Sequence, residues 1–303
     1  MRVTLVLLMG AGALARPAFA QTSVAAADRP PRVMVGDALT GSPSNATTSV
    51  SPATIPQAME RADDLGDALS FSLGAQFAHG DFGVDADTSI QSYALGARLR
   101  RGGWRLSASL PWMRIRSKAT LFTGIDGTPV LIAPDGASAA RRTARGFGDL
   151  TLGAAYTLRP ADSALELELS GRVKLNTASR SSRLSSGETD YALGAQVTRP
   201  VGRFAPFASV TYRFLGDSAA YRLRDGFAAS AGVSVEAGPR ALVLASYHYA
   251  QAATRLVDDS HELFLGASTA VRDSGLRLTG FATAGLSRGA PAASAGLALS
   301  KAF

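Results

Sequence analysis

Hydrophobic and polar residues alternate through residues 163–177, which read SALELELSGRVKLNT. The odd positions from 165 to 175 are apolar or glycine, and the even positions from 166 to 176 are charged or polar. Because successive side chains of a β-strand point to opposite faces, this segment predicts a strand with one apolar face and one charged face. The pattern of the remaining chain decides which face points outward.

The same alternation recurs twelve times. The alternating segments are 69–77, 93–99, 104–112, 150–158, 165–175, 191–197, 204–214, 227–235, 242–249, 263–267, 276–286 and 293–299. The ninth is less regular, because Leu242 and Leu244 lie on the parity opposite to Val243 and Ala245. Segments of about ten residues with period two, divided by turn residues, are typical of transmembrane β-barrel strands.

Short and long connections alternate along the chain. RGG, PAD, PVG, AGPR and DSG form every second connection, whereas the others are mostly longer and the longest runs from about 117 to 145. A transmembrane barrel has short periplasmic turns and longer external loops, and its closure leaves no sheet edge in lipid. We therefore predict an all-β fold over residues 67–303, a single antiparallel transmembrane β-barrel of twelve strands with its apolar face toward the membrane.

The first 66 residues have a different composition. Arg2, an apolar run over 3–14 and the sequence Ala18-Phe19-Ala20 predict a secretory signal peptide over residues 1–20. Residues 21–66 are rich in Ala, Ser, Thr and Pro, which predicts a flexible periplasmic segment, and residues 55–65 are a candidate short helix within it. The expected location is the cell outer membrane.

The overall composition narrows the function classes. The chain has 303 residues, is 46% hydrophobic and contains no cysteine, so neither a disulfide framework nor a Cys-ligated metal site is expected, and we predict no cofactor. The net charge is +7, but the arginines are scattered through the strands rather than gathered in a basic arm. Nucleic acid is therefore not an expected partner.

The chain ends in Phe303, which closes an alternating strand containing Leu297 and Leu299. A terminal aromatic residue in this position resembles the assembly signal of bacterial outer-membrane proteins. The expected partners are therefore outer-membrane lipids, a small-molecule solute and the barrel-assembly machinery. Lys301 departs from the signal, and its ammonium could extend into the headgroups.

Several motifs resemble one family. SASLPWMRI, GFGDLTLGAAYTL, GRVKLNTAS, GETDYALG and FAPFASVTYRFLGD occur in the order found in outer-membrane transporters described as the MetA pathway of phenol degradation. The resemblance covers roughly residues 67–303 and implies a channel or uptake pore for small, apolar or aromatic compounds. Asn176 departs from it, because the family usually has proline there.

The inward parity carries the candidate channel-lining residues. They are Arg98, Arg100, Arg105, Glu166, Glu168, Arg172, Lys174, Arg213 and Arg277. A polar lumen is what a water-filled channel needs, although such charges could instead pair and fill a narrow barrel. A tight turn at 160–162 suggests Leu158 near Leu165, and this register brings Asp149 opposite Lys174. With Asp190 at a similar height, we predict an inward triplet Asp149–Lys174–Asp190.

Two alternatives use the external loops. The sequence Asp259-Ser260-His261 and the pair Asp85 and Asp87 resemble the arrangement of omptin-type proteases, in which an Asp-oriented His would activate water, although that family has ten strands. His79 and His248 are the remaining histidines. A closed structural or adhesive barrel is the other alternative. Its loop 117–145, with the apolar centre PVLIAP, would bind a partner or fold inward as a constriction.

Overall fold

The computed structural model describes residues 67–82, 87–125, 129–134, 142–161, 163–179, 182–216, 223–272 and 274–303. The predicted signal peptide, the segment 21–66 and its candidate helix lie outside these residues. The described strands are β1 (Ala68–Gly80), β2 (Thr88–Arg101), β3 (Trp104–Ser117), β4 (Ala119–Thr123), β5 (Pro129–Pro134), β6 (Arg142–Phe147), β7 (Leu150–Leu158), β8 (Glu166–Leu175), β9 (Asp190–Thr198), β10 (Phe204–Phe214), β11 (Gly226–Glu236), β12 (Ala241–Ala250), β13 (Ser260–Ala270), β14 (Leu276–Gly285) and β15 (Ala293–Ala302).

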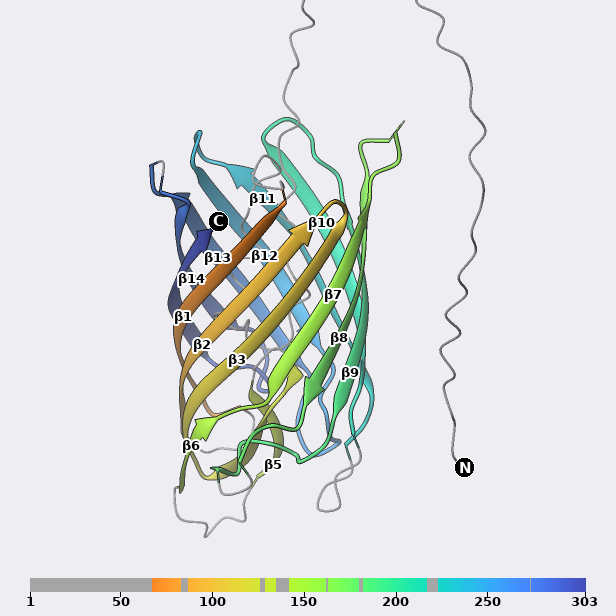
Figure 1. Ribbon diagram of the computed structural model, residues 1–303. Coiled ribbons are helices and arrows are strands. Elements are labelled where there is room, and N and C mark those ends of the chain that lie inside the picture. The colour runs from red at the N-terminus through yellow and green to blue at the C-terminus, as the bar shows by residue number, and fades with distance from the viewer. Residues whose placement is uncertain are drawn as a thin grey trace, which may run out of the picture. The chain divides into compact units, whose positions relative to one another are not determined.

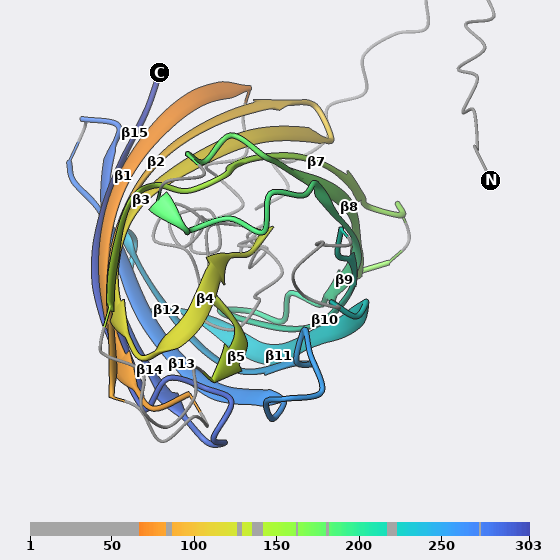
Figure 2. The same cartoon turned by 90° about the horizontal axis from the view of Figure 1, so that it is seen from below.

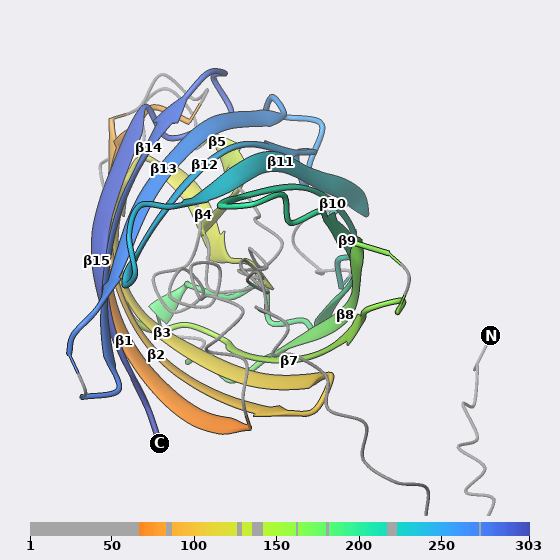
Figure 3. The same cartoon turned by 90° about the horizontal axis from the view of Figure 1, so that it is seen from above.

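Twelve of these strands form a closed antiparallel ring (Figure 1). The order around the ring is β1, β2, β3 and then β7 to β15, and β15 pairs with β1 to close it. Views along the axis show the ring from both ends (Figures 2 and 3). Each alternating segment of the sequence lies in one of these twelve strands, to within one residue at its ends, so the predicted barrel is confirmed. Within the described residues, no helix is long and apolar enough to span a membrane.

The apolar parity faces outward. Leu95, Leu193 and Leu265 are 57–59% exposed, whereas the intervening inward residues are buried. Aromatic pairs border this apolar surface: the rings of Trp104 and Tyr156 are 4.9 Å apart near the short turns. Leucines exposed around a whole barrel and bordered by aromatic rings are the pattern of a surface that contacts lipid. The barrel is therefore transmembrane, with its short turns at the periplasmic end.

The β7–β8 turn corrects the predicted register. Leu158 pairs with Leu167 rather than with Leu165. The turn is longer than expected because the Ser163 amide donates to the Pro160 carbonyl and the Ser163 hydroxyl accepts from the Leu165 amide, which keeps these residues out of the strand. Strand β8 therefore starts at Glu166.

The segment 117–145, which was expected to be a loop, contains three short strands. Strands β4 and β5 form a separate two-stranded sheet that crosses the long-loop opening of the barrel (Figure 2). Strand β6 extends the wall beyond β7, because both pair with β3. The PVLIAP segment forms β5.

A one-residue bulge separates β6 from β7. Ser109 pairs with Thr151, whereas Trp112 pairs with Phe147, so β6–β7 has one more residue than the facing stretch of β3. Gly146, with φ of 146°, supplies a backbone conformation that other residues rarely adopt. Bulges redirect neighbouring side chains, and this one, at residues 148–150, includes the fully buried Asp149.

Candidate functional site

The inner face of the barrel carries charged and polar side chains. All the predicted lumen residues except Asp149, which lies between β6 and β7, are on strand positions whose side chains alternate with the exposed outer face. The most buried are Asp149, Lys174 and Asp190, with exposures of 0%, 1% and 3%. The others are Arg98, Arg100, Arg105, Glu166, Glu168, Arg172, Arg213 and Arg277, all buried or partly buried.

Lys174 lies between the two aspartates, as the sequence predicts. Its Nζ is 2.7 Å from Asp190 Oδ2 and 3.4 Å from Asp149 Oδ2. Asp190 is directly opposite Lys174 across β8 and β9. The expected pairing of Asp149 with Lys174 is wrong, because the longer turn shifts the register and Lys174 faces Thr151 instead. Asp149 reaches the ammonium group diagonally from the bulge.

Asp149 also holds the loop between β8 and β9. Its Oδ1 accepts hydrogen bonds from the amides of Thr177 and Ala178, at 3.0 and 2.9 Å. Its Oδ2 accepts from the hydroxyl of Ser185, at 2.6 Å. The triplet is therefore the anchor of loop 176–189 at the extracellular end.

Asn176 has its own role in this loop. Its Nδ2 donates to the Gly187 carbonyl at 2.6 Å and joins the two ends of the loop. Proline, which the resemblance leads one to expect here, has no such donor. The departure therefore supplies a closing hydrogen bond.

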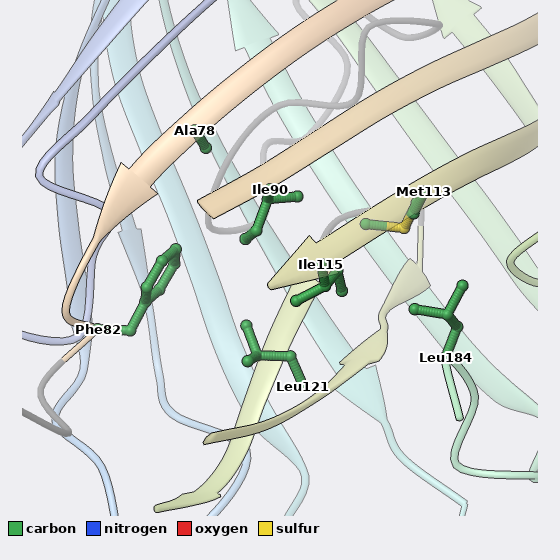
Figure 4. Close-up of a cluster of buried hydrophobic side chains, with 7 residues drawn as sticks. All are labelled: Ala78, Phe82, Ile90, Met113, Ile115, Leu121 and Leu184. Atoms are coloured by element: carbon green, nitrogen blue, oxygen red, sulfur yellow. The ribbon is translucent and has the colours of Figure 1, made fainter. Parts of the chain in front are cut away.

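The anchored loop contributes to an apolar cluster inside the extracellular mouth (Figure 4). The cluster consists of Ala78, Phe82, Ile90, Met113, Ile115, Leu121 and Leu184, each at most 4% exposed. Leu184 comes from loop 176–189, Leu121 from β4, and four others from the inner face of β1–β3. We call this set the mouth cluster. Part of segment 117–145 therefore folds inward.

The other charges have partners within the wall. Arg105 pairs with Glu168 at 2.5 Å, across from β3 to β8, and Arg159 pairs with Glu166 at 2.8 Å. Several arginines bond to neutral groups on nearby elements: Arg98 donates to Ser70, Arg277 to Ser268, and Arg213 to the Gln251 carbonyl. These contacts cross-link the strands on the inner face of the barrel.

One group of aromatic side chains on the inner face of the barrel was not predicted from the sequence. Phe264 and Phe281 stack with ring centroids 5.9 Å apart and 13° between planes, and His248 meets Phe264 edge-on at 5.9 Å. We call these three residues the aromatic wall. They come from β12–β14, which lie across the ring from β3, β7 and β8, and of these β3 carries Arg105 and β8 carries Arg172. The sequence signal that could have revealed them is a phenylalanine among the polar, inward positions of a strand: Phe264 in β13 and Phe281 in β14.

Among the described residues, no hydrogen bond or ion pair joins Asp259 to His261, the pair on which the hydrolytic alternative depended. The carboxylate of Asp259 accepts from the Tyr249 hydroxyl at 2.7 Å and from the Ala252 amide at 2.8 Å. His261 Nδ1 instead faces the Tyr247 hydroxyl. His79 pairs with Asp87 at 3.2 Å, His248 contacts Ser246, and Asp85 lies outside the described residues.

The contacts of Asp259 lower the pKa of its carboxyl. Burial acts to raise the pKa of this carboxyl, but the Ala252 amide, the Tyr249 hydroxyl and the Arg224 guanidinium outweigh it and lower the pKa below its ordinary value. Asp259 therefore ties the β12–β13 loop as a carboxylate. Among the residues that the structure describes, no three His, Asp or Glu side chains gather in a way that could hold a metal ion.

These features define a class, the transmembrane β-barrels of the outer membrane with a polar lumen. Residues 62–277 match the family described as "Putative MetA-pathway of phenol degradation", and the chain belongs to this family. A comparison with curated proteins found no match.

Solved structures share the fold. One is the COG4313 outer membrane channel from Pseudomonas putida F1, at 15% identity and a TM-score of 0.60, covering 78% of this chain and 96% of that one. Another is the translocator domain of the autotransporter NalP from Neisseria meningitidis, at 14% identity and 0.51, covering 80% and 92%. At these identities the likeness establishes the barrel architecture.

Proposed function

We propose that the protein is an outer-membrane channel through which small aromatic compounds cross. The observation that carries this proposal is the aromatic wall on the inner face of the barrel, on strands across the ring from those of Arg105 and Arg172. Phenylalanine rings that face a lumen offer stacking surfaces, and arginines offer hydrogen bonds to a hydroxyl or carboxylate on the same solute. The family description, which names phenol degradation, supports this class of solute.

The layout suggests a path in two stages. A solute arriving from outside first meets the mouth cluster, whose side chains are buried against one another and must part for it to pass. An aromatic ring compensates for this separation better than a hydrated ion does, because it keeps apolar surface out of water. Deeper in the barrel, the aromatic wall and the charged strands receive the two ends of a polar aromatic molecule. In this proposal, the charged residues of the inner face line the path of the solute.

Single-channel recordings in planar bilayers test this proposal. Phenol should cause transient, concentration-dependent blocks of the ion current. A variant with Phe264→Leu and Phe281→Leu keeps an apolar surface but loses ring stacking, which is worth about 0.5–1.5 kcal/mol per aromatic pair. Its blocks should therefore be shorter, by roughly two- to tenfold. Cyclohexanol is the matched control solute, and equal block durations for both solutes would refute aromatic recognition.

The same proposal covers three further expectations. The protein transports rather than hydrolyses, so His261→Ala should leave it without a change in any hydrolytic activity. Residues 1–20 are removed on export. The C-terminal strand is presented to the barrel-assembly machinery by its last residue: Phe303 is 72% exposed, its ring lies 6.2 Å from that of Phe71, and the Lys301 ammonium lies 5.2 Å from its centroid.

A further inference from the structure

Arginines gather on the outer surface where β3 and β6 project beyond the apolar belt. Arg114, Arg116 and Arg145 are exposed and alternate with the buried Met113 and Ile115 or with partly buried residues. Their side chains therefore point away from the lumen. We call these three residues the arginine patch.

The patch places like charges face to face. Arg114 pairs directly with Arg145 across the two strands, where Cβ atoms are about 4.5–5.5 Å apart. Arg116 follows on the same face of β3. Like charges directly opposite each other destabilise a strand pair. No carboxylate of the described residues lies within salt-bridge distance of these three guanidinium groups. Such an arrangement is stabilised when an anion binds between the arginines.

The aromatic residues below the patch fix its height in the membrane. Trp112 and Phe147 are directly paired one step nearer the belt, and the Tyr93 ring lies 5.9 Å from that of Trp112. On the same strand, Trp104 marks the periplasmic border, eight residues or ~26 Å along β3 from Trp112. That length, on a tilted strand, matches the ~25 Å apolar band of such barrels. The arginine patch therefore lies at the level of the outer-leaflet headgroups.

We propose that the arginine patch binds the phosphate groups of the phosphorylated glycolipid of the outer leaflet. Guanidinium groups bind phosphate oxygens in pairs, so Arg114 and Arg145 hold one phosphate between them, with Arg116 beside it. The aromatic floor of Trp112 and Phe147 packs against the acyl chains of the same lipid. The inference is independent of what crosses the lumen, because every residue involved points outward.

Native mass spectrometry of the detergent-purified, full-length protein tests this site. Lipid A, which carries the phosphates, is the probe, and the wild type should retain it while dephosphorylated lipid A binds more weakly. Each arginine near a charged membrane surface contributes ~1 kcal/mol, or about fivefold in affinity. The Arg114→Gln, Arg145→Gln variant should thus bind lipid A about 25-fold more weakly. Arg101→Gln, Arg203→Gln is the matched control, because both arginines are exposed at the periplasmic end.

Three results would overturn the proposal. One is wild-type affinity in the Arg114→Gln, Arg145→Gln variant when its shift on heated and unheated gels shows a folded barrel. Another is equal affinity for lipid A and its dephosphorylated form. The third is displacement of lipid A by inorganic phosphate together with an unchanged affinity in Phe147→Ala, because the aromatic floor would then contribute nothing.

Discussion

Lys174 shows how one buried side chain joins a strand register to a loop. Its side chain is 1% exposed, and two carboxylates face its ammonium. Removing one partner of a buried ion pair leaves uncompensated charge, which typically costs about 3–5 kcal/mol. Because Asp149 also accepts two loop amides, the effect should reach loop 176–189.

We predict that Lys174→Met lowers the temperature at which the barrel unfolds, measured by the change from the compact to the extended band on gels. Adding Asp149→Asn and Asp190→Asn removes the like-charge repulsion and should restore part of the loss. The same variant separates two roles. Unchanged conductance and ion selectivity would make the triplet a scaffold, whereas a shift toward cations would make it a filter.

Asp259 gives the β12–β13 loop a dependence on pH. Its pKa is lower in the folded protein than in the unfolded chain, where it is about 3.9. Its contribution to stability is therefore complete above that unfolded pKa and is lost as the pH falls through the folded pKa. We predict that acid increases protease cleavage within 251–259 in the wild type. Asp259→Asn should be cleaved readily at neutral pH and change little in acid; an acid response equal to that of the wild type would assign the effect to another group.

Individual residues explain where sequence reasoning succeeded and where it stopped. The parity of Lys174 and Asp190 placed both in the lumen, since side-chain direction follows from alternation alone. The register at Asp149 was two residues out, because it depended on the hydrogen bonds of Ser163 in a turn. The aromatic wall was hidden by the assumption that phenylalanine marks the lipid face. Phe82 and Leu184 lie in loops, where no period points to a neighbour.

At the scale of elements, the β6 strand was missed because alternation stops carrying information outside the lipid. Beyond Trp112 the outward positions no longer need apolar side chains, and Arg142–Phe147 therefore reads as a basic loop. Strand β5 was missed for another reason. Its centre is an unbroken apolar run without alternation, and the prolines at both ends cannot donate the backbone hydrogen bonds of a sheet. The twelve wall strands were predictable because one face of each contacts lipid, which requires an apolar residue at every second position.

The mouth cluster joins β4 and loop 176–189 to the wall, and we predict that loosening it raises conductance. Leu121→Ser and Leu184→Ser each place a hydroxyl among residues that are at most 4% exposed. Both should shorten the closed intervals in single-channel recordings. Leu256→Ser is the matched control, because Leu256 lies in the β12–β13 loop and is 65% exposed. Identical recordings from the three variants would show that the cluster does not limit the current.

For the whole molecule, the outward leucines and aromatic rings set how the protein behaves outside a membrane. We predict that the folded protein is recovered with outer membranes and migrates faster on unheated than on heated SDS gels, because the closed ladder resists the detergent until heated. Recovery of natively folded protein from the soluble periplasmic fraction would contradict this assignment. Leu193→Lys, at an outward position near the middle of β9, should reduce recovery, since a lysine at the bilayer midplane costs about 2–4 kcal/mol.

The pairing of β1 with β15 has a consequence for how the barrel forms. Every other wall contact joins wall strands that are consecutive in the sequence, so each closes a much shorter stretch of chain. The contact of Ser70 with Ala302 instead spans nearly the whole described chain and is available only after the last strand has been delivered. The β1–β15 pairing therefore has the largest sequence separation of the wall contacts and the largest loss of chain entropy on closure. A chain that stops before residue 293 would lack β15, the strand that closes the sheet into a barrel. Its unpaired edges, on β1 and β14, would pair with the edges of other copies in the membrane.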